Sequence, residues 1–222
     1  MNKITPTADG SNTLYNEEIG EHYHSKHGAL QESKHVFIAA GLEHAAVRIP
    51  GQEISILEVG FGTGLNFLLS AAYCAWHKIK LKYTSLEAFP LTNDELESTG
   101  YNNYIPAEIW HNMIHNYGKA MQQTVNIQPE QQLRIVHTWL HRYHTEQRFD
   151  LVYYDAFSVQ HQPEMWSDEI IAYTCQFLKP GGIFVTYAIT GKLKRALKSI
   201  GFTIEKLPGA PGKREMLRAT KN

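Results

Sequence analysis

The sequence predicts a Rossmann-like α/β fold: a mostly parallel, seven-stranded sheet with helices on both faces and an antiparallel C-terminal hairpin. Three observations predict it. Short β-branched and apolar runs alternate with segments of helical periodicity along most of the chain. The first run is followed by three glycines at alternate positions, Gly60, Gly62 and Gly64. Several runs also end on a carboxylate residue, and the carboxyl ends of parallel strands share one edge of a sheet.

Each element has a local signal. Apolar residues recur at helical spacing over 32–47, although Gly41 weakens this pattern, and Pro50 and Gly51 then interrupt the chain. The β-branched run 54–59 predicts a buried strand. Further strands are expected at 81–87, 132–136, 149–155, 183–187, 202–206 and 215–219. Helices are expected at 65–76 and 92–98, after Pro106, from Thr138, and at 166–177 and 191–200.

The N-terminal segment lacks such a pattern. Residues 1–31 show no periodicity, so we expect an arm there. The sequence therefore divides into residues 1–50, an arm and a helix that pack on the ligand site, and residues 51–222, the main domain.

Composition limits the class of protein. A hydrophobic fraction of 43% in 222 residues indicates a globular chain with a substantial core. No apolar run approaches the ~20 residues that span a bilayer, and the polar N-terminus has no secretory signal, so we expect a cytoplasmic protein without membrane contact. Cys74 and Cys175 stand in apolar helical patterns, as expected of reduced core thiols. The histidine clusters at 22–27 and 137–144 lack a metal-binding spacing, and we expect no metal.

Charge is unevenly distributed along the chain. Residues 191–222 contain nine Lys or Arg and two acids, giving +7, whereas the first 190 residues give −8. A basic C-terminal face suits a polyanionic partner, and a solvated surface is the alternative that charge alone leaves open.

The glycine turn predicts a bound cofactor. Glycines permit positive φ angles and a close approach of the backbone to a ligand, and the next helix points its free N–H groups to the same place. A dinucleotide fingerprint needs G-x-G-x-x-G, whereas this sequence has G-x-G-x-G with Glu58 two residues before the first glycine. A carboxylate there favours a cationic ligand over a phosphate. The pattern resembles the first motif of S-adenosylmethionine (SAM) methyltransferases, with another nucleotide or a mere tight turn as alternatives.

Two more strand ends provide chemistry. Glu87, about 25 residues after the glycines, suits the hydroxyls of a ribose. Asp155 can orient a nucleophilic amine and stabilise its developing positive charge. Phe157 can flank the substrate, and Trp166, at the mouth of the next helix, is a candidate for stacking a flipped base. A closing antiparallel hairpin is the methyltransferase variant of the doubly wound fold.

Several segments resemble the MnmC-like methyltransferase domain. They are LEVGFGTGLNF at 57–67, EAFPL at 87–91, DAFS at 155–158, PEMW at 163–166, KPGGIFVTY at 179–187, PGAPGKREML at 208–217, and GALQES at 28–33 with HVF at 35–37. The resemblance runs from about residue 14 to residue 219. DAFS…PEMW and GKREML are more specific than the glycine motif.

The resemblance implies a class I SAM methyltransferase that N-methylates the 5-aminomethyl group of the wobble uridine in certain tRNAs. Its implied SAM site comprises Glu32, Glu58, Gly60, Phe61, Gly62, Gly64, Asn66, Glu87, Thr138 and Asp155. Asp155 is the implied catalytic residue, and the implied substrate-binding residues are Phe157, Trp166, Lys213 and Arg214.

The sequence departs from the family in two ways. Bifunctional members append a flavin-dependent oxidase that uncovers the amine, whereas this sequence stops at Asn222, so we expect a separate FAD-dependent enzyme upstream or an amine that arrives ready-made. Members also tend to carry an acid near the adenine where this sequence has His137 and Thr138, so we expect Thr138 or backbone groups to take that role. The alternatives are a methyltransferase for a small-molecule or protein amine, and a SAM-fold binding module without catalysis.

Overall fold

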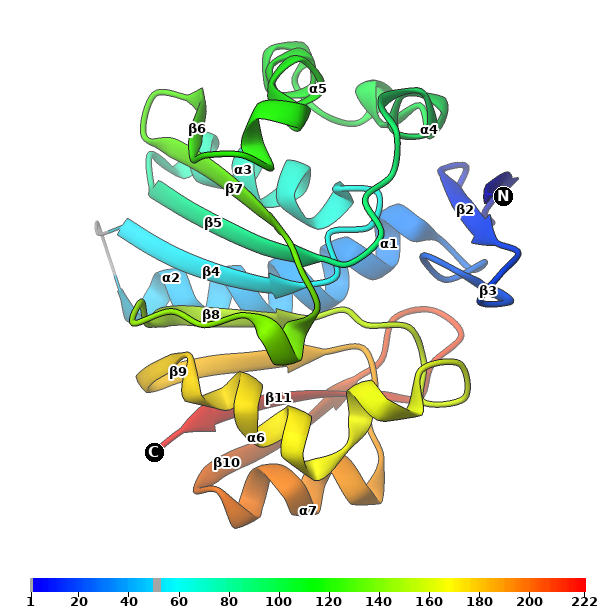
Figure 1. Cartoon of the computed structure of the whole chain (residues 1–222). Coiled ribbons are helices and arrows are strands. Elements are labelled where there is room, and N and C mark those ends of the chain that lie inside the picture. Colours follow the sequence, from blue (N-terminus) through cyan, green and yellow to red (C-terminus); the bar gives the residue numbers. More distant parts are fainter. Residues whose placement is uncertain (1, 50–52) are drawn as a thin grey trace.

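A central sheet organises the molecule. The computed structural model describes residues 2–49 and 53–222. Eight strands form one sheet in the order β10-β11-β9-β8-β4-β5-β7-β6, and a separate sheet contains β1, β2 and β3 (Figure 1). Strands β9, β8, β4, β5 and β7 are parallel, whereas β6 and β11 run antiparallel to β7 and β9.

The strands are β1 Asn2–Pro6, β2 Asn12–Asn16, β3 Glu21–His22, β4 Glu53–Val59, β5 Lys80–Glu87, β6 Val125–Gln128, β7 Gln131–His137, β8 Phe149–Tyr154, β9 Leu178–Thr186, β10 Phe202–Pro208 and β11 Glu215–Lys221. The α-helices are α1 Ala29–Ser33, α2 His44–Arg48, α3 Leu65–His77, α4 Asn93–Ser98, α5 Ala107–Ala120, α6 Asp168–Gln176 and α7 Gly191–Ser199. A π-helix spans Lys34–Glu43, and short 3-10 helices span Tyr101–Asn103, Leu140–Arg142 and Pro163–Trp166.

This arrangement confirms the predicted fold class, and all seven expected strands are present. The sheet has one strand more than expected, because the four-residue β6 adds to β7 through a turn in which Glu130 has a φ of 68°. So short a strand carries too little alternation to be predicted, and its pairing depends on the partner strand. The expected interruption at Pro50 and Gly51 lies outside the described residues.

The N-terminal segment is not a patternless arm. Strands β1, β2 and β3 form a small antiparallel sheet beside one end of the central sheet (Figure 1). Its first turn satisfies free N–H groups at the start of α1: Asp9 Oδ2 accepts from the backbone N–H of Gln31 at 2.9 Å, and Ser11 Oγ accepts from that of Leu30 at 3.1 Å. The expectation for 1–31 was wrong because these polar strands are stabilised by contacts that lie distant in sequence.

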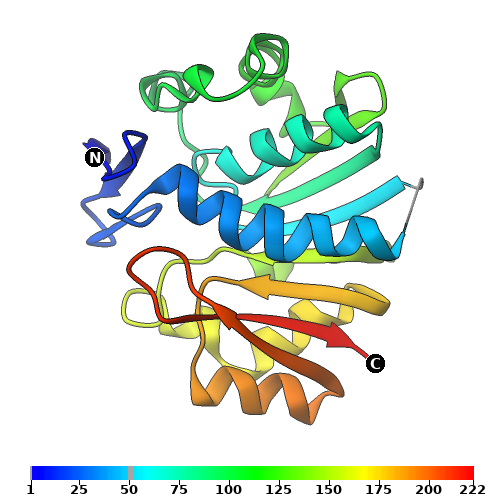
Figure 2. The same cartoon turned by 180° about the vertical axis from the view of Figure 1, so that it is seen from behind.

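The helix expected at 32–47 is confirmed as one helical stretch from α1 through the π-helix to α2 (Figure 2). Gly41 does not break it. A Cβ atom at Gly41 would lie 3.1 Å from the side chains of Tyr153 and Val185, so glycine lets the helix pack closely on the sheet. The i→i+5 pattern of the middle section is not visible in the apolar periodicity.

Helices cover both faces of the sheet, as predicted. The helical stretch 29–48, α3 and α5 cover one face, and α6 and α7 cover the other (Figures 1 and 2). Cys74 and Cys175 are both buried and unpaired, one in each core. The helix expected from Thr138 is only the 3-10 turn Leu140–Arg142, and α6 begins after Ser167, whose side chain caps it. Among the described helices, none combines the length and apolar character that a membrane span needs.

Candidate active site

A cavity of about 350 Å³ opens at the carboxyl ends of the central parallel strands. Its walls come from the strand ends and following loops, from the N-terminal segment, and from the loop between β10 and β11. The predicted site residues that line it are Glu32, Gly60, Phe61, Gly62, Glu87, Thr138, Asp155, Phe157 and Lys213. The predicted residues that do not line it are Glu58, Gly64, Asn66, Trp166 and Arg214.

The glycine turn forms the floor on one side. The N–H of Gly60 donates to the carbonyl of Leu86 at 3.0 Å, which joins the ends of β4 and β5. Gly60 has a φ of 91°, and a Cβ there would lie 2.7 Å from the carbonyl oxygen of Asp155. Only glycine fits both this positive φ and the close approach of the Asp155 carbonyl, which follows β8.

Glu87 is fixed by the same turn. Its Oε2 accepts from the backbone N–H of Gly62 at 2.9 Å, and its Oε1 accepts from that of Phe89 at 2.8 Å. A carboxylate can accept about four hydrogen bonds, so each oxygen retains capacity for a ligand hydroxyl. Thr138 follows β7 beside it, and its N–H donates to the carbonyl of Glu87 at 3.0 Å.

A buried amide joins two carboxyl groups below the other side of the cavity. The Asn66 Nδ2 group donates to Asp155 Oδ2 at 2.8 Å and to Glu58 Oε1 at 3.0 Å. Glu58 also accepts from the Ser85 hydroxyl at 2.8 Å, and its side chain is completely buried. Glu58 and Asn66 therefore lie beneath the cavity, where they hold Asp155 from behind. Gly64 is likewise behind the wall, at the start of α3.

The environment raises the pKa of both carboxyl groups. Burial, followed by the negative charge of Glu32, raises the pKa of Asp155 to about 7, although the Asn66 amide and the Lys213 cation act in the opposite direction. Burial and then the charge of Asp155 raise the pKa of Glu58 well above its usual value. Asp155 thus exchanges a proton near neutral pH, as a general base requires.

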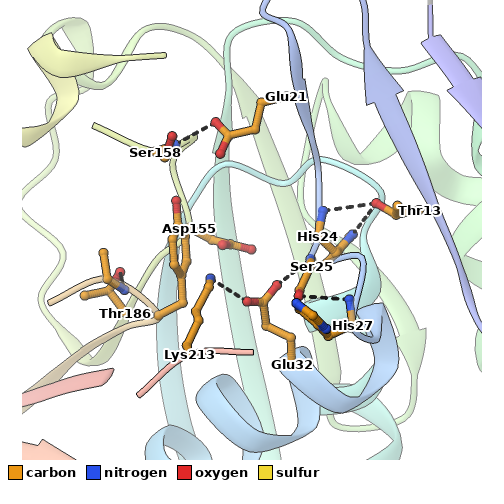
Figure 3. Close-up of polar contacts among 12 residues, drawn as sticks. Thr13, Glu21, His24, Ser25, His27, Glu32, Asp155, Ser158, Thr186 and Lys213 are labelled. Atoms are coloured by element: carbon orange, nitrogen blue, oxygen red, sulfur yellow. Dashed lines mark hydrogen bonds and ion pairs between the residues drawn. The ribbon is translucent and has the colours of Figure 1, made fainter. Parts of the chain in front are cut away.

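Lys213 reaches the cavity from the loop between β10 and β11 (Figure 3). Its Nζ donates to Glu32 Oε1 at 2.7 Å and lies 3.7 Å from the centre of the Tyr187 ring. Glu32 Oε2 accepts from the backbone N–H of Ser25 at 2.8 Å. Both oxygens of Glu32 therefore have partners, and one of them is a cation.

The N-terminal segment contributes residues that the sequence did not reveal. Glu21, Tyr23 and His24 line the cavity. Tyr23 packs edge-on against Phe157 with ring centroids 5.1 Å apart, and Glu21 Oε2 accepts from the N–H of Ser158 at 2.8 Å. No periodic pattern in the sequence marks these positions as site residues. The nearest signal is that Glu21 and Tyr23 stand two residues apart, shortly before the GALQES motif.

Trp166 has a different place from the one expected. Its side chain is only 5% exposed, and its Nε1 donates to the carbonyl of Phe157 at 2.8 Å. It also packs on the rings of Tyr154 and Tyr187. Trp166 is therefore buried beneath the loop that carries Phe157, where it has no free face for stacking a base.

Much of the basic C-terminal charge is used internally. Lys206, Lys213 and Arg218 pair with Glu215, Glu32 and Glu205, Lys192 lies 4.0 Å from Asp168, and Lys221 donates to the carbonyls of Cys175 and Leu178. Among the described cations of residues 191–222, those without such a partner are Lys194, Arg195, Lys198 and Arg214. Arg214 is exposed outside the cavity.

The histidine clusters do not converge on a common point. Within the described part of the chain, no three His, Cys, Asp or Glu side chains gather into a group that could hold a metal ion. His24 is buried, and burial lowers its pKa to about 4.

Comparison with known proteins identifies the cofactor. Residues 106–222, just over half of the chain, match the family model described as S-adenosyl-L-methionine-dependent methyltransferase. The chain belongs to this family. Among curated relatives, the methyltransferase is 31% identical to "tRNA 5-methylaminomethyl-2-thiouridine biosynthesis bifunctional protein MnmC" from Chromohalobacter salexigens, over 94% of this chain and 31% of the relative. It is 30% identical to the protein of that name from Ectopseudomonas mendocina, over 89% of this chain and 32% of the relative.

The methyltransferase therefore spans about a third of the length of the curated relatives it matches. These matches confirm the resemblance to the MnmC methyltransferase domain.

Two solved structures share the fold of this chain. MnmC2 from Aquifex aeolicus has a TM-score of 0.79 at 24% identity, covering 100% of this chain and 70% of that one. Magnesium protoporphyrin IX methyltransferase from Synechocystis, solved with bound SAM, has a TM-score of 0.51 at 12% identity, covering 82% of this chain and 76% of that one.

SAM, the cofactor of this family, fits the groups that line the cavity. SAM carries a sulfonium and an ammonium group, and four carboxyl groups line the walls, those of Glu21, Glu32, Glu87 and Asp155. The space against Gly60, which a Cβ would fill, lets the backbone approach a ligand closely. The four carboxyl groups in the lining thus favour a cationic nucleoside over a phosphorylated one.

Proposed function

We propose that this methyltransferase transfers a methyl group from SAM to the 5-aminomethyl nitrogen of the wobble uridine in tRNA. The motif resemblance and the names of the curated relatives support this acceptor. The observation that carries the proposal is the carboxyl group of Asp155. It lines the cavity, is held by Asn66, and has a pKa raised to about 7 by burial.

The cofactor residues follow from their positions. We assign the ribose hydroxyls to Glu87, the closest backbone contacts to Gly60, Phe61 and Gly62, and the adenine side to Thr138. Glu32, at the opposite end with Asp155, faces the charged part of the cofactor. Glu58, Gly64 and Asn66 support this wall from behind. In this proposal residues 1–50 form a cover over the cavity and residues 51–222 form the catalytic domain.

The chain's own groups prepare the acceptor. When bound, SAM supplies an electrophilic methyl carbon, and its carbon–sulfur bond breaks with the electron pair on sulfur as the carbon–nitrogen bond forms. Asp155 takes a proton from the acceptor ammonium, which frees the nitrogen lone pair for attack. The hydrogen bond from Asn66 fixes Oδ2 of Asp155, and we assign the proton transfer to Oδ1. Phe157 and Tyr187 line the cavity, and we assign to their rings the exclusion of water around the acceptor.

Labelled SAM and undermodified tRNA provide the test. Wild-type protein should yield 5-methylaminomethyl nucleosides on digestion. Asp155→Asn should lower kcat by about 10²- to 10⁴-fold, the usual contribution of a general base, and should leave SAM affinity measured by calorimetry within about twofold. Transfer only to a small amine or a protein would refute the tRNA assignment, and SAM binding with no transfer to any acceptor would indicate a binding module.

We further propose that tRNA phosphates contact Arg214 and, on α7, Arg195 and Lys198, because these three exposed cations have no internal partner among the described residues. Arg195→Ala with Lys198→Ala should weaken tRNA binding and flatten its salt dependence by about two counterions, whereas Lys119→Ala, on α5, should not. Equal affinity of all variants for tRNA at moderate salt would contradict this binding surface.

We propose a cytoplasmic location and a separate flavin-dependent enzyme that exposes the amine beforehand.

A further inference from the structure

Glu21 is a second carboxyl group at the acceptor end of the cavity. It belongs to β3 in the N-terminal sheet, yet it lines the same cavity as Asp155 (Figure 3). The backbone N–H of Ser158, three residues after Asp155, donates to its Oε2 at 2.8 Å. Within the described residues, its Oε1 has no hydrogen-bond partner. The N-terminal sheet thus delivers a fixed carboxylate with one oxygen available to a ligand.

Within the described part of the chain, neither Glu21 nor Asp155 forms a salt bridge. The third carboxyl group, Glu32, is paired with Lys213. The carboxyl groups of Glu21, Glu32 and Asp155 line one cavity together with Tyr187. Burial, followed by the charges of Asp155, Glu21 and Glu32, raises the pKa of the Tyr187 hydroxyl.

The basic residues close to Glu21 in sequence that line the cavity include Lys26 and, adjacent in β3, His22. Burial, followed by the charge of Lys26, lowers the pKa of His22. Of the residues that line the cavity here, the three carboxyl groups of Glu21, Glu32 and Asp155 outnumber the two ammonium groups of Lys26 and Lys213. A bound cation between Glu21 and Asp155 balances this excess.

We propose that Glu21 and Asp155 together bind the acceptor as an ammonium ion, with Glu21 as its second carboxylate contact and Asp155 as its base. This inference rests on the proposed function. An N–H bond of the ammonium breaks and its proton goes to Asp155. The freed lone pair forms the bond to the methyl carbon while the carbon–sulfur bond breaks, and the product is again an ammonium, which Glu21 continues to neutralise.

This arrangement makes Glu21 a specificity determinant. A protonated amine gains a charge-assisted hydrogen bond at each carboxylate, whereas a methyl or hydroxymethyl group in the same place leaves one carboxylate unbalanced. The site thus selects RNA in which the wobble uridine already carries a free amine.

Binding of two RNA probes tests the inference. The probes are anticodon stem–loops with 5-aminomethyluridine or 5-methyluridine at the wobble position, titrated against the protein in the presence of the product S-adenosylhomocysteine. Wild-type protein should prefer the amine probe. Glu21→Gln should reduce that preference roughly ten- to a hundredfold, because Gln keeps an oxygen for the Ser158 N–H but loses the charge. Glu18→Gln, an equal charge loss in the preceding turn, should retain the preference.

Other results separate the two proposals. If wild-type protein shows no preference for the amine probe, the proposed acceptor is wrong. If it shows the preference and Glu21→Gln keeps it, or if Glu18→Gln loses it equally, the role of Glu21 is wrong. Glu21→Ala also removes the contact to Ser158, so an effect confined to Ala would assign Glu21 to loop positioning alone. Affinity for S-adenosylhomocysteine should be the same in wild type, Glu21→Gln and Glu18→Gln, which confirms that the site is folded.

Discussion

Replacing Asp155 by Asn should stabilise the fold while it lowers kcat, and the gain in stability should depend on pH. Burial raises the pKa of Asp155 from 3.8 to about 7. At about 1.4 kcal/mol per pH unit, this difference corresponds to at most about 4 kcal/mol of destabilisation by the charged carboxylate. Asn has the same shape, its oxygen can accept the hydrogen bond from Asn66, and it carries no charge.

The sign follows from proton binding. Below pH 4 the carboxyl group is protonated in both the folded and the unfolded chain, so its ionisation contributes no difference. Between pH 4 and 7 the folded chain keeps a proton that the unfolded chain has lost, so wild-type stability falls as pH rises. The advantage of Asp155→Asn should therefore grow over this range and level off above pH 7. The charges that face Asp155 are those of Glu21, Glu32, Glu58 and Lys213.

Urea denaturation at pH 5 and pH 8.5 measures the effect. The difference in unfolding free energy between variant and wild type should be larger by a few kcal/mol at pH 8.5 than at pH 5. Asp150→Asn, at the other end of β8, is the matched control: Asp150 accepts from Ser55 and pairs with Lys179, so its loss should destabilise the protein by about 1–3 kcal/mol. An equal effect of Asp155→Asn at both pH values would refute the reasoning.

Three further substitutions test the surroundings of Asp155. Gly60→Ala should cost about 2 kcal/mol or more and weaken SAM binding, because its Cβ would lie 2.7 Å from the Asp155 carbonyl; calorimetry and melting curves check this. Lys213→Met should move the acid limb of the kcat/KM profile to higher pH, because the cation lowers the pKa of Asp155; an unmoved limb would contradict it. Asn66→Ala should reduce stability by about 1–3 kcal/mol, because Glu58 and Asp155 both lose a donor; denaturation that matches wild type would oppose this.

The fold was largely predictable because its signals are local. Buried parallel strands such as β4 and β8 are nearly continuous apolar runs, and the glycines after β4 mark the turn at its end. The prediction failed where a segment depends on distant partners. The N-terminal sheet is short and polar, and its contacts with the start of α1 determine its position.

The site divides in the same way. Glu87 and Asp155 were predictable, because a carboxylate at the end of a parallel strand must lie at one edge of the sheet. Glu21 was not, because β3 has two residues and reaches the cavity only through tertiary packing. Trp166 was expected at the substrate, and its burial under the Phe157 loop depends on neighbouring rings.

The sequence by itself determined the α/β fold, the glycine turn and the strand-end carboxylates, since residue type and spacing specify backbone conformation over a few neighbours. Tertiary structure alone decided that Asn66 connects Glu58 to Asp155, that Lys213 pairs with Glu32, and that the N-terminal sheet brings Glu21 to the cavity. These contacts join segments far apart in the chain. The pKa of Asp155 depends on burial and on charges that only folding brings together.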